Sequence, residues 1–565
     1  MKKVLKQIIA IALAATMCMS ATGCKFASEY DKLLSDYNAL LAQMQREQED
    51  AKNSSSSEKS TSKKASSKKN KASSSSKKSG TSSKNKDTQS SSSKNQSTNS
   101  PVNDDIELEV EDFEDIFDDY EFDDSDFEDM DLGELLGIKG YDFVVSSPWM
   151  AKTAASAKLE QEKTFFEVAD IIEELFGCTI TVQGGNINTV ESLRPLIMSG
   201  SKVADAVDVL ASSTLALASA GYIVPWNEID GMDMTSDVYV KGYSNLAKIN
   251  GDYYGLSFLR APEARMCVMF NKGVLKSAGI NSDGIYDLVK AKKWNWETLR
   301  SYAKTVVQKN TSNNVTHIWG IGGYYQKVAS ALYMSNGARL AQLKNGVGTV
   351  TVTDTNMKEA INFMDKLINE DKVYDASRYR NASTFDTSDN GQYKTMFQSG
   401  KLGFMIEECF WLAKYFDKSF DYGIAPVPMG PRATNYITDA GNARVWTCTS
   451  TNAKSKDIDK TMIILTLLAS GCAYPNDTID NDDWWQYDLK REYFRNDHDK
   501  NLEVYNILLD TAAVDYGAAV TGLQQEFLHS VVRDAVFCRQ GTVESRISSV
   551  GPMYSSTVAR ALTLK

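Results

Sequence analysis

Short apolar segments alternate with longer amphipathic segments from residue 141 onward. The apolar segments have the length of buried strands, while the amphipathic ones carry apolar residues every three or four positions, as one face of a helix does. The predicted strands cover residues 141–146, 179–182 and 206–210, and the predicted helices cover 159–176, 190–198 and a segment beginning at 215. Because strands and helices alternate, the pattern predicts an α/β fold with parallel, doubly wound sheets.

A similar pattern continues in the second half of the chain. We expect strands at residues 254–260 and 265–270, with Pro262 between them as a hinge, and two more at 401–406 and 422–427. The third of these strands is followed by two glutamates and an amphipathic segment rich in aromatic residues. Ligands of open α/β sheets bind at the carboxyl ends of strands, so this loop is the first place where we expect a binding site.

The first 23 residues have the pattern of an export signal. Three lysines precede an apolar core at residues 8–19, which is shorter than the roughly twenty residues needed to span a bilayer. Residues 21–24, Ala-Thr-Gly-Cys, resemble a bacterial lipobox. That resemblance implies that Cys24 carries a lipid anchor after cleavage of a lipoprotein signal peptide. Ordinary cleavage elsewhere, with Cys24 unmodified, is the alternative.

Three segments of unusual composition follow the leader. Residues 24–50 have helical apolar spacing and predict a membrane-proximal stalk, while residues 51–103 are mostly Ser, Lys, Asn and Thr and predict a disordered linker. Residues 104–136 are acidic with interleaved aromatic residues, and like charges keep such a segment extended. Its carboxylates lack EF-hand spacing, so calcium binding is only an alternative here. The folded domain is predicted at residues 137–565.

Charge and cysteine content exclude several classes of function. The net charge of −12 combines a basic linker with an acidic segment that follows it, so the average conceals two opposite charge runs. Because the lysines lie in a low-complexity tract and not on a folded face, we expect no nucleic-acid partner. The 8 cysteines and 3 histidines form no C-x-x-C pair and no zinc spacing, so we expect neither metal nor cofactor. The six cysteines after the leader predict buried thiols more than disulfides.

Several motifs occur in the order found in one family. Residues 397–401 read Phe-Gln-Ser-Gly-Lys and are followed by Trp411, by "DYGIAPVPMGP" at 421–431 and by "AGNA" at 440–443. Together with "NTVESLRPLIMSGSKVADAVDVL" and "NGDYYGLSFLRAPEARMCVMFNK" upstream, these motifs resemble extracellular solute-binding proteins of the family that includes maltose-binding protein, the external receptors of sugar-importing ABC transporters. The chain departs from that family in having Glu-Glu-Cys-Phe before the tryptophan.

The resemblance implies a two-lobed, periplasmic-binding-protein-like fold (type II), each lobe holding a doubly wound, mainly parallel sheet. Lobe 1 would comprise about 137–260 and 435–510, and lobe 2 about 264–430 and 515–565. The lobes of such receptors close on a solute without chemistry, so the chain would be no enzyme. Its implied partners are ABC permease subunits and the membrane, through the lipid on Cys24. We expect a monomer on the extracellular face of the bacterial cell membrane.

A sugar presents apolar C–H faces and a rim of hydroxyls, which aromatic and polar side chains bind respectively. We expect an oligosaccharide because aromatic residues are plentiful near the strand ends. The candidate ligand contacts are Trp149, Ser212, Ser213, Tyr324, Tyr325, Glu407, Glu408, Trp411, Arg444 and His529. For each tryptophan and tyrosine, packing in the core is the alternative. Trp294 and Trp296 are expected to pack against the helix that follows them.

An exported glycan hydrolase and a cell-surface adhesin or sensor subunit are the alternatives to a receptor. Residues 199–202 satisfy S-x-x-K, but no S-D-N or K-T-G accompanies them. Glu407 and Glu408 are adjacent on a strand, where side chains alternate between faces, so we do not expect a glycosidase pair. The long linker fits an adhesin as well as it fits a receptor.

Overall fold

The structure is a computed structural model that describes residues 131–564, apart from 237, 260–264, 382, 384–390, 410–419, 474–493 and 495–496. The predictions about the leader, Cys24, the stalk, the linker, most of the acidic segment, Pro262 and Trp411 lie outside the described residues.

The folded region begins earlier than predicted. Helix α4 (Leu132–Leu135) starts at Asp131, whose side chain accepts a hydrogen bond from the Glu134 N–H at 2.9 Å. Leu132 and Leu136 are buried, and α4 packs against α5 (Glu160–Phe176). The folded region therefore includes residues from 131 onward, because Leu132 and Leu136, which were predicted to belong to the acidic segment, are buried in the core.

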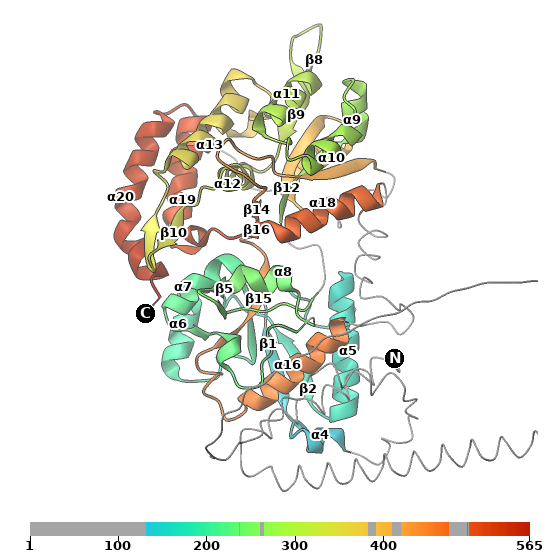
Figure 1. Ribbon diagram of the computed structural model, residues 1–565, viewed down its shortest axis with the longest axis vertical. Helices are drawn as coiled ribbons and strands as arrows, with labels where there is room; N and C mark the ends of the chain where they lie inside the picture. The colour runs from blue at the N-terminus through green and yellow to red at the C-terminus, as the bar shows by residue number, and fades with distance from the viewer. Residues whose placement is uncertain are drawn as a thin grey trace, which may run out of the picture. The chain divides into compact units, whose positions relative to one another are not determined.

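The first sheet has the strand order β2-β1-β3-β15-β4. Its strands β1, β2 and β15 are labelled in Figure 1. Its strands are β1 (Asp142–Ser146), β2 (Thr179–Gln183), β3 (Ala206–Leu210), β4 (Ile223–Val224) and β15 (Arg444–Thr449). β1 pairs in parallel with β2 and β3, whereas β15 runs against both of its neighbours. Its helices are α5, α6 (Val190–Ser199), α7 (Thr214–Ser219) and α16 (Ile458–Ala473). The alternation predicted for residues 141–221 is confirmed.

The second sheet has the order β13-β7-β12-β9-β8. Its strands are β7 (Met266–Asn271), β8 (Gln308–Lys309), β9 (Thr316–Gly322), β12 (Leu402–Glu408) and β13 (Tyr422–Pro426). β12 is parallel to β9, but β7 runs against both β12 and β13, so this sheet is mixed. Its helices include α9 (Lys272–Ser277), α10 (Asp283–Lys290), α11 (Trp296–Val306), α12 (Tyr325–Ser335), α13 (Thr355–Asp365) and α14 (Gln392–Gln398). We call each sheet with its helices a lobe.

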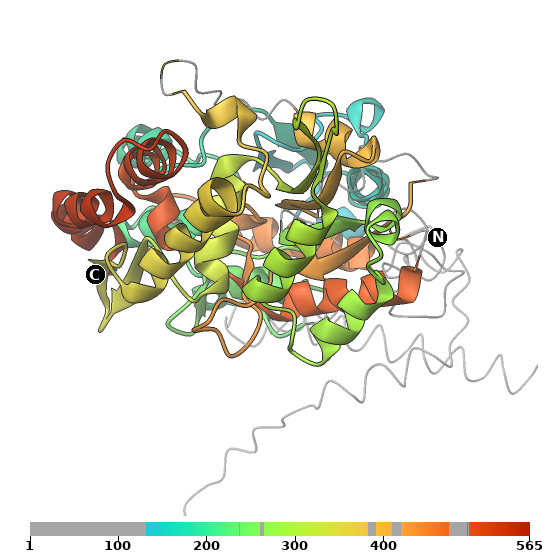
Figure 2. The ribbon, with the colours of Figure 1, turned by 90° about the horizontal axis from the view of Figure 1, so that it is seen from above.

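The C-terminal segments complete the second lobe. Figure 2 shows the red helix α20 (Val543–Leu562) beside the yellow hairpin of β10 (Ala341–Lys344) and β11 (Val347–Val350), which it contacts. The other elements here are η11 (Tyr516–Ala519), α19 (Leu523–Glu526) and the π-helix η12 (Phe527–Phe537). Leu215 and Ala216 of α7 belong to the same apolar cluster as the second-lobe core. The two lobes therefore share buried apolar surface.

The remaining short elements lie between the main strands and helices along the chain. They are η3 (Ala154–Ser156), η4 (Ala211–Ser213), η5 (Trp226–Glu228), α8 (Lys241–Ser244), η6 (Asn245–Ala247), β5 (Lys248–Ile249), β6 (Asp252–Tyr253), η7 (Lys366–Glu370), η8 (Ser377–Tyr379), β14 (Thr438–Asp439) and β16 (Ala512–Ala513). β14 and β16 pair in parallel as a separate two-stranded sheet. The strand predicted at 254–260 was wrong, since only a single bridge forms there, between Leu256 and Trp446.

One helix lies in the lobe opposite to the one predicted. Residues 498–510, predicted for lobe 1, form α18 (His498–Asp510), which packs against β13 of the second sheet. Asn501 fixes this position, because its side-chain oxygen accepts hydrogen bonds from Tyr286 Oη at 2.8 Å and from the Ile424 N–H at 3.1 Å. The assignment of residues 498–510 to lobe 1 was therefore wrong, because the helix packs against the second sheet.

The predicted core tryptophans and free thiols are confirmed. Trp294 is fully buried and donates to the Pro426 carbonyl at 2.8 Å, while Trp296 is buried and stacks on Phe363 at 4.6 Å between ring centroids. The six cysteines between 178 and 538 are free, and all but Cys538 are buried. Both tryptophans therefore serve the core of the second lobe.

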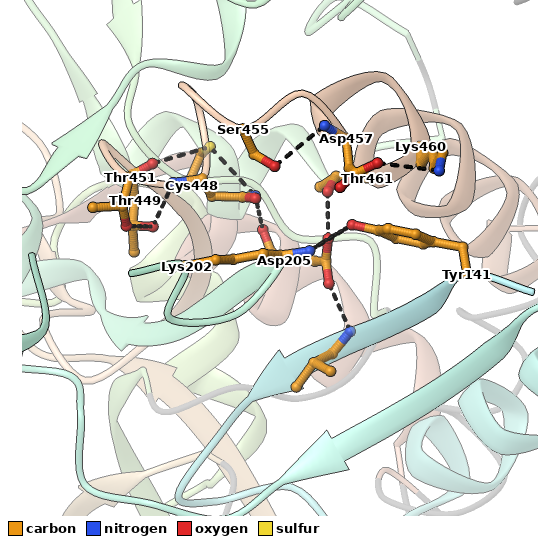
Figure 3. A network of polar contacts seen from close by, with 12 residues as sticks. Tyr141, Lys202, Asp205, Cys448, Thr449, Thr451, Ser455, Asp457, Lys460 and Thr461 are labelled. Atoms are coloured by element: carbon orange, nitrogen blue, oxygen red, sulfur yellow. Dashed lines mark hydrogen bonds and ion pairs between the residues drawn. The ribbon is translucent and has the colours of Figure 1, made fainter. Parts of the chain in front are cut away.

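A buried carboxylate ties the amino end of the first sheet to α16 (Figure 3). Asp205, which is fully buried, accepts hydrogen bonds from Tyr141 Oη at 2.7 Å, from the Val144 N–H at 2.8 Å and from Thr461 Oγ1. Lys202 Nζ contacts the same carboxylate at 2.7 Å. Because one group satisfies donors from three elements, it fixes how they pack.

We expect Asp205→Ala to destabilise the protein by about 2–4 kcal/mol, because three donors, one buried and two partly buried, lose their acceptor at once. Denaturant unfolding followed by tryptophan fluorescence measures the loss. Asp457→Ala is the matched control, since Asp457 lies in the same network but forms only a surface pair with Lys460 at 3.1 Å. Equal effects of the two substitutions would contradict this account of Asp205.

Candidate functional site

Trp149 is an exposed tryptophan at the carboxyl end of β1. Its side chain keeps 40% of its surface exposed, although the strand before it is mostly buried. The Ser147 hydroxyl accepts hydrogen bonds from the Trp149 and Met150 N–H groups at 3.2 and 3.0 Å and so fixes the loop. A ring presented in this way offers a flat apolar surface beside polar groups.

Those polar groups lie on the neighbouring strands of the first sheet. Asp208 on β3 is buried and accepts a hydrogen bond from Ser147 Oγ at 2.7 Å. Arg444 at the start of β15 lies 3.7 Å from the same carboxylate, between Nη1 and Oδ2. Lys152 Nζ donates to the Ser147 carbonyl, and burial lowers the pKa of Lys152. The edge therefore combines one aromatic ring with charged groups of both signs.

The second lobe contributes two buried glutamates. Glu407 and Glu408, the last residues of β12, are only 3% and 7% exposed. Lys327 on α12 lies 2.6 Å from Glu407 Oε1 and 3.3 Å from Glu408 Oε2. Burial raises the pKa of Glu407, while the ammonium of Lys327 opposes that shift. The two carboxylates thus share one cation.

One hydrogen bond joins the carboxyl edges of the two sheets. Asn442 Nδ2, in the loop before β15, donates to Glu408 Oε1 at 2.8 Å. In the same loop the Gly441 carbonyl accepts from the Ser212 N–H at 3.1 Å, directly after β3. A group of the second lobe therefore lies within contact of the strand ends of the first lobe, as a site shared by two lobes requires.

A second pair of buried carboxylates lies behind this edge. Asp439 on β14 and Asp515 before η11 both have raised pKa values because they are buried. Asp515, with a pKa raised to about 6, accepts from the Leu340 N–H at 2.8 Å and lies near Arg339 and Tyr333. With a pKa of about 6, Asp515 holds a proton in the folded state only below about pH 6.

The elevated pKa of Asp515 predicts a pH dependence of stability. The folded protein holds this proton up to about pH 6, whereas the unfolded chain releases it near pH 4, so stability falls as pH rises between these values. Above pH 6 both states are deprotonated and this contribution is constant. We expect a change on the order of 2–3 kcal/mol across the window. Urea unfolding at pH 4.5, 5.5 and 6.5 measures this change in the free energy of unfolding. The change should be smaller in Asp515→Asn, and an equal change in the variant would mean that Asp515 does not cause it.

The remaining predicted contacts are scattered. Tyr325 is fully buried and packs against Tyr379 and Phe537, so it belongs to the core. Tyr324 is half-buried and meets the Tyr325 ring edge-on. His529 is half-buried on η12, an element that packs against α19 and α20. Ser213 is half-buried at the start of α7.

Lys327, Asn442, Asp208 and Lys152 were not among the predicted site residues. Lys327 lies on an amphipathic helix, where a single lysine usually indicates a solvent-facing position. Asp208 had a usable signal, since it is the one charged residue within a buried strand of sequence AVDVL. The described residues hold no group of three or more metal-ligating side chains.

The S-x-x-K motif does not form a catalytic pair. Ser199 Oγ donates to the Leu196 carbonyl at 2.7 Å, while Lys202 contacts Asp205 and Tyr141. Burial lowers the pKa of Lys202, but these partners outweigh it and leave the pKa raised, the opposite of what a general base needs. Among the described residues, no helix is both long enough and apolar enough to span a bilayer.

Comparison with known proteins gives one family and one fold. The family model described as bacterial extracellular solute-binding protein matches residues 143–468, more than half of the chain. No curated protein sequence matches the chain at a significant level.

Three solved structures share its fold, each with a TM-score of 0.51 and each aligned over 74% of this chain. UspC of Mycobacterium tuberculosis is 15% identical and is covered over 100% of its length. UgpB of the same organism, in complex with glycerophosphocholine, is 14% identical and covered over 98%. The cyclic alpha-maltosyl-1,6-maltose binding protein of Arthrobacter globiformis is 13% identical and covered over 99%. The predicted two-lobed α/β fold is thereby confirmed.

Proposed function

Because the chain belongs to the bacterial extracellular solute-binding proteins, we propose that it captures a carbohydrate between its two lobes and delivers it to an ABC importer. The solute is an oligosaccharide. The chain acts by binding and closure, without turnover, and its direct partners are the permease subunits of the importer.

The exposed ring of Trp149 carries this proposal. A tryptophan with 40% of its surface exposed beside the carboxylate of Asp208 and the guanidinium of Arg444 matches the two faces of a sugar. The ring covers apolar C–H groups, while charged and amide side chains bind hydroxyls. Glu408 and Asn442 supply further polar groups where the lobes meet.

Two of the structural relatives are described with different solutes. The Arthrobacter protein is named for a cyclic maltosyl-maltose, whereas UgpB was solved with glycerophosphocholine. At 13% and 14% identity these ligands define a range for testing and not an assignment. The site's mixture of acidic and basic groups is compatible with both neutral and charged solutes.

A thermal-shift panel tests the receptor function. The chain from residue 25 onward is mixed with mono- and oligosaccharides, amino acids, peptides and glycerophosphodiesters, and each sample is then analysed for products. A solute that binds only the folded state raises the melting temperature by mass action. A rise with saccharides and no products supports the proposal. Turnover of a glycan would replace it with a hydrolase, and a panel without any response would contradict it.

We further propose that a monomer is held on the outer face of the cell membrane by a lipid on Cys24. Two or three acyl chains suffice for stable anchoring. Cys24→Ala should therefore move the protein from the membrane fraction to the medium, with binding unchanged. Cell fractionation measures where the protein is found, and mass spectrometry of the amino-terminal peptide measures whether Cys24 carries a lipid. Unchanged membrane retention would count against the anchor.

A further inference from the structure

Arg265 is a fully buried arginine directly before β7, and it was not among the predicted site residues. Its main-chain carbonyl accepts a hydrogen bond from the Cys409 N–H at 2.8 Å, immediately after Glu408. The residue therefore lies at the same edge of the second sheet as the glutamate pair. This edge faces the segment of the first lobe that includes α8, as the contacts of the side chain demonstrate.

The guanidinium of Arg265 reaches across to the first lobe. Nη2 donates to the Gly242 carbonyl at 3.1 Å, and the Tyr243 ring lies under the guanidinium carbon at 4.3 Å from its centroid. Both partners belong to α8. Since the side chain belongs to one lobe and its contacts to the other, separation of the lobes uncovers the guanidinium, and closure buries it.

Two of the three guanidinium nitrogens have no acceptor. Nε and Nη1 are buried and make no hydrogen bond in the part of the chain that the structure describes. A carbonyl and an aromatic face do not neutralise the charge, so the group is a buried cation without an anion. Such a group costs several kcal/mol unless an anion or several acceptors satisfy it.

The other cations near the two strand edges differ in this respect. Lys327 contacts both Glu407 and Glu408, and Arg444 lies 3.7 Å from Asp208. Arg339 donates to the Val514 carbonyl at 3.1 Å, next to the Asp515 carboxylate. Each of these cations has a carboxylate beside it. Among the described residues no carboxylate pairs with Arg265, so an anion from outside the protein fits this position.

We propose that Arg265 binds an oxyanion carried by the solute, a carboxylate or a phosphate group, so that the captured carbohydrate is acidic. This inference rests on the proposed receptor function and specifies its substrate class. Nε and Nη1 donate to the oxyanion, while Nη2 keeps its bond to Gly242. Charge-assisted hydrogen bonds of this kind are about twice as strong as neutral ones. The buried guanidinium also rejects neutral analogues, because they leave its donors unsatisfied.

The experiment adds matched acidic and neutral saccharides to the thermal-shift panel described above. The affinity of the protein for each saccharide is then measured by isothermal titration. One pair is trigalacturonic acid and its methyl ester, and the other is maltose 6′-phosphate and maltose. We expect at least 30-fold tighter binding of the acidic member in one pair. The carboxylate pair and the phosphate pair distinguish the two sources of the oxyanion.

Variants assign the effect to Arg265. Arg265→Met should lower affinity for the acidic probe at least 30-fold, leave the neutral partner's affinity unchanged, and keep or raise the melting temperature without solute, since it removes an unpaired buried charge. Arg546→Met is the control, because it removes one positive charge on α20 far along the chain. Arg265→Lys is the second variant, to be used if the methionine variant does not fold. It keeps the charge without the planar guanidinium group, so its affinity for the acidic probe should fall at least tenfold.

The outcomes separate this inference from the receptor function. Saccharides that bind equally well with and without the acidic group overturn the inference and leave the receptor function intact. Equal loss in Arg265→Met for both members of a pair, or a loss of the same size in Arg546→Met, also overturns it. A whole panel without response overturns the receptor function and this inference with it.

Discussion

Replacing Lys327 by methionine is expected to lower the free energy of unfolding by about 3–5 kcal/mol, because the change leaves Glu407 and Glu408 buried without their shared cation. The two carboxylates are adjacent and repel each other, so the side chain of Lys327 stabilises both. Denaturant unfolding at pH 7 measures the loss. Solute binding should weaken as well, because Glu408 then no longer holds its place beside Asn442.

A double substitution and a surface control make this prediction specific. Glu407→Gln in the Lys327→Met background removes one of the unpaired charges and should recover part of the stability. Lys344→Met is the control, because Lys344 forms an exposed pair with Asp354 at 3.7 Å and such pairs contribute little. If Lys327→Met costs no more than Lys344→Met, the glutamate pair does not depend on this lysine.

Trp149→Ala should weaken binding of the cognate saccharide at least tenfold, with little change in the melting temperature of the protein without solute. The ring already exposes 40% of its surface, so its removal leaves only a small gap in the packing. A tenfold change corresponds to about 1.4 kcal/mol, within the range for loss of one aromatic contact face. Isothermal titration with the solute found in the thermal-shift panel measures the change.

Met198→Ala provides the comparison for Trp149→Ala. Met198 is the more exposed of the two, at 78%, but it lies at the end of α6. Its removal should leave both affinity and stability unchanged. Unchanged affinity in Trp149→Ala would mean that the ring does not contact the solute, and a strong loss of stability would mean that it serves the loop instead.

Six strands of the two sheets, β1, β2, β3, β7, β12 and β13, could be predicted because each is a short, largely apolar segment with a clear end. β3 and β12 show this well: both are almost entirely buried, two serines follow β3 after one alanine, and β12 ends in two glutamates. Glu407 and Glu408 could likewise be singled out, since two carboxylates at the end of an apolar strand need a partner. That partner could not be predicted, because Lys327 lies 80 positions away on helix α12, whereas the glutamates end a strand.

Longer-range packing accounts for the other errors. The helix at 498–510 is assigned to the second lobe by its packing against β13 and by the hydrogen bonds of Asn501 with Tyr286 and Ile424, all of which join residues far apart in the sequence. Arg265 escaped notice because a lone arginine before a strand usually points to solvent. Tyr325 was placed near the site through the family resemblance, yet three aromatic neighbours are reason enough for a tyrosine there.

The place of β15 within the first sheet has a consequence for folding. This strand lies between β3 and β4, yet Thr447 Oγ1 donates to the Val207 carbonyl across 240 positions of sequence. If the chain is exported from its amino terminus, all strands of the second sheet are available before residue 449 is. The first sheet cannot complete its strand pairing until β15 has been exported. Contacts of such long range slow folding and leave unpaired strand edges open to aggregation in the meantime. The carboxyl-terminal half therefore determines when the amino-terminal half becomes a stable lobe.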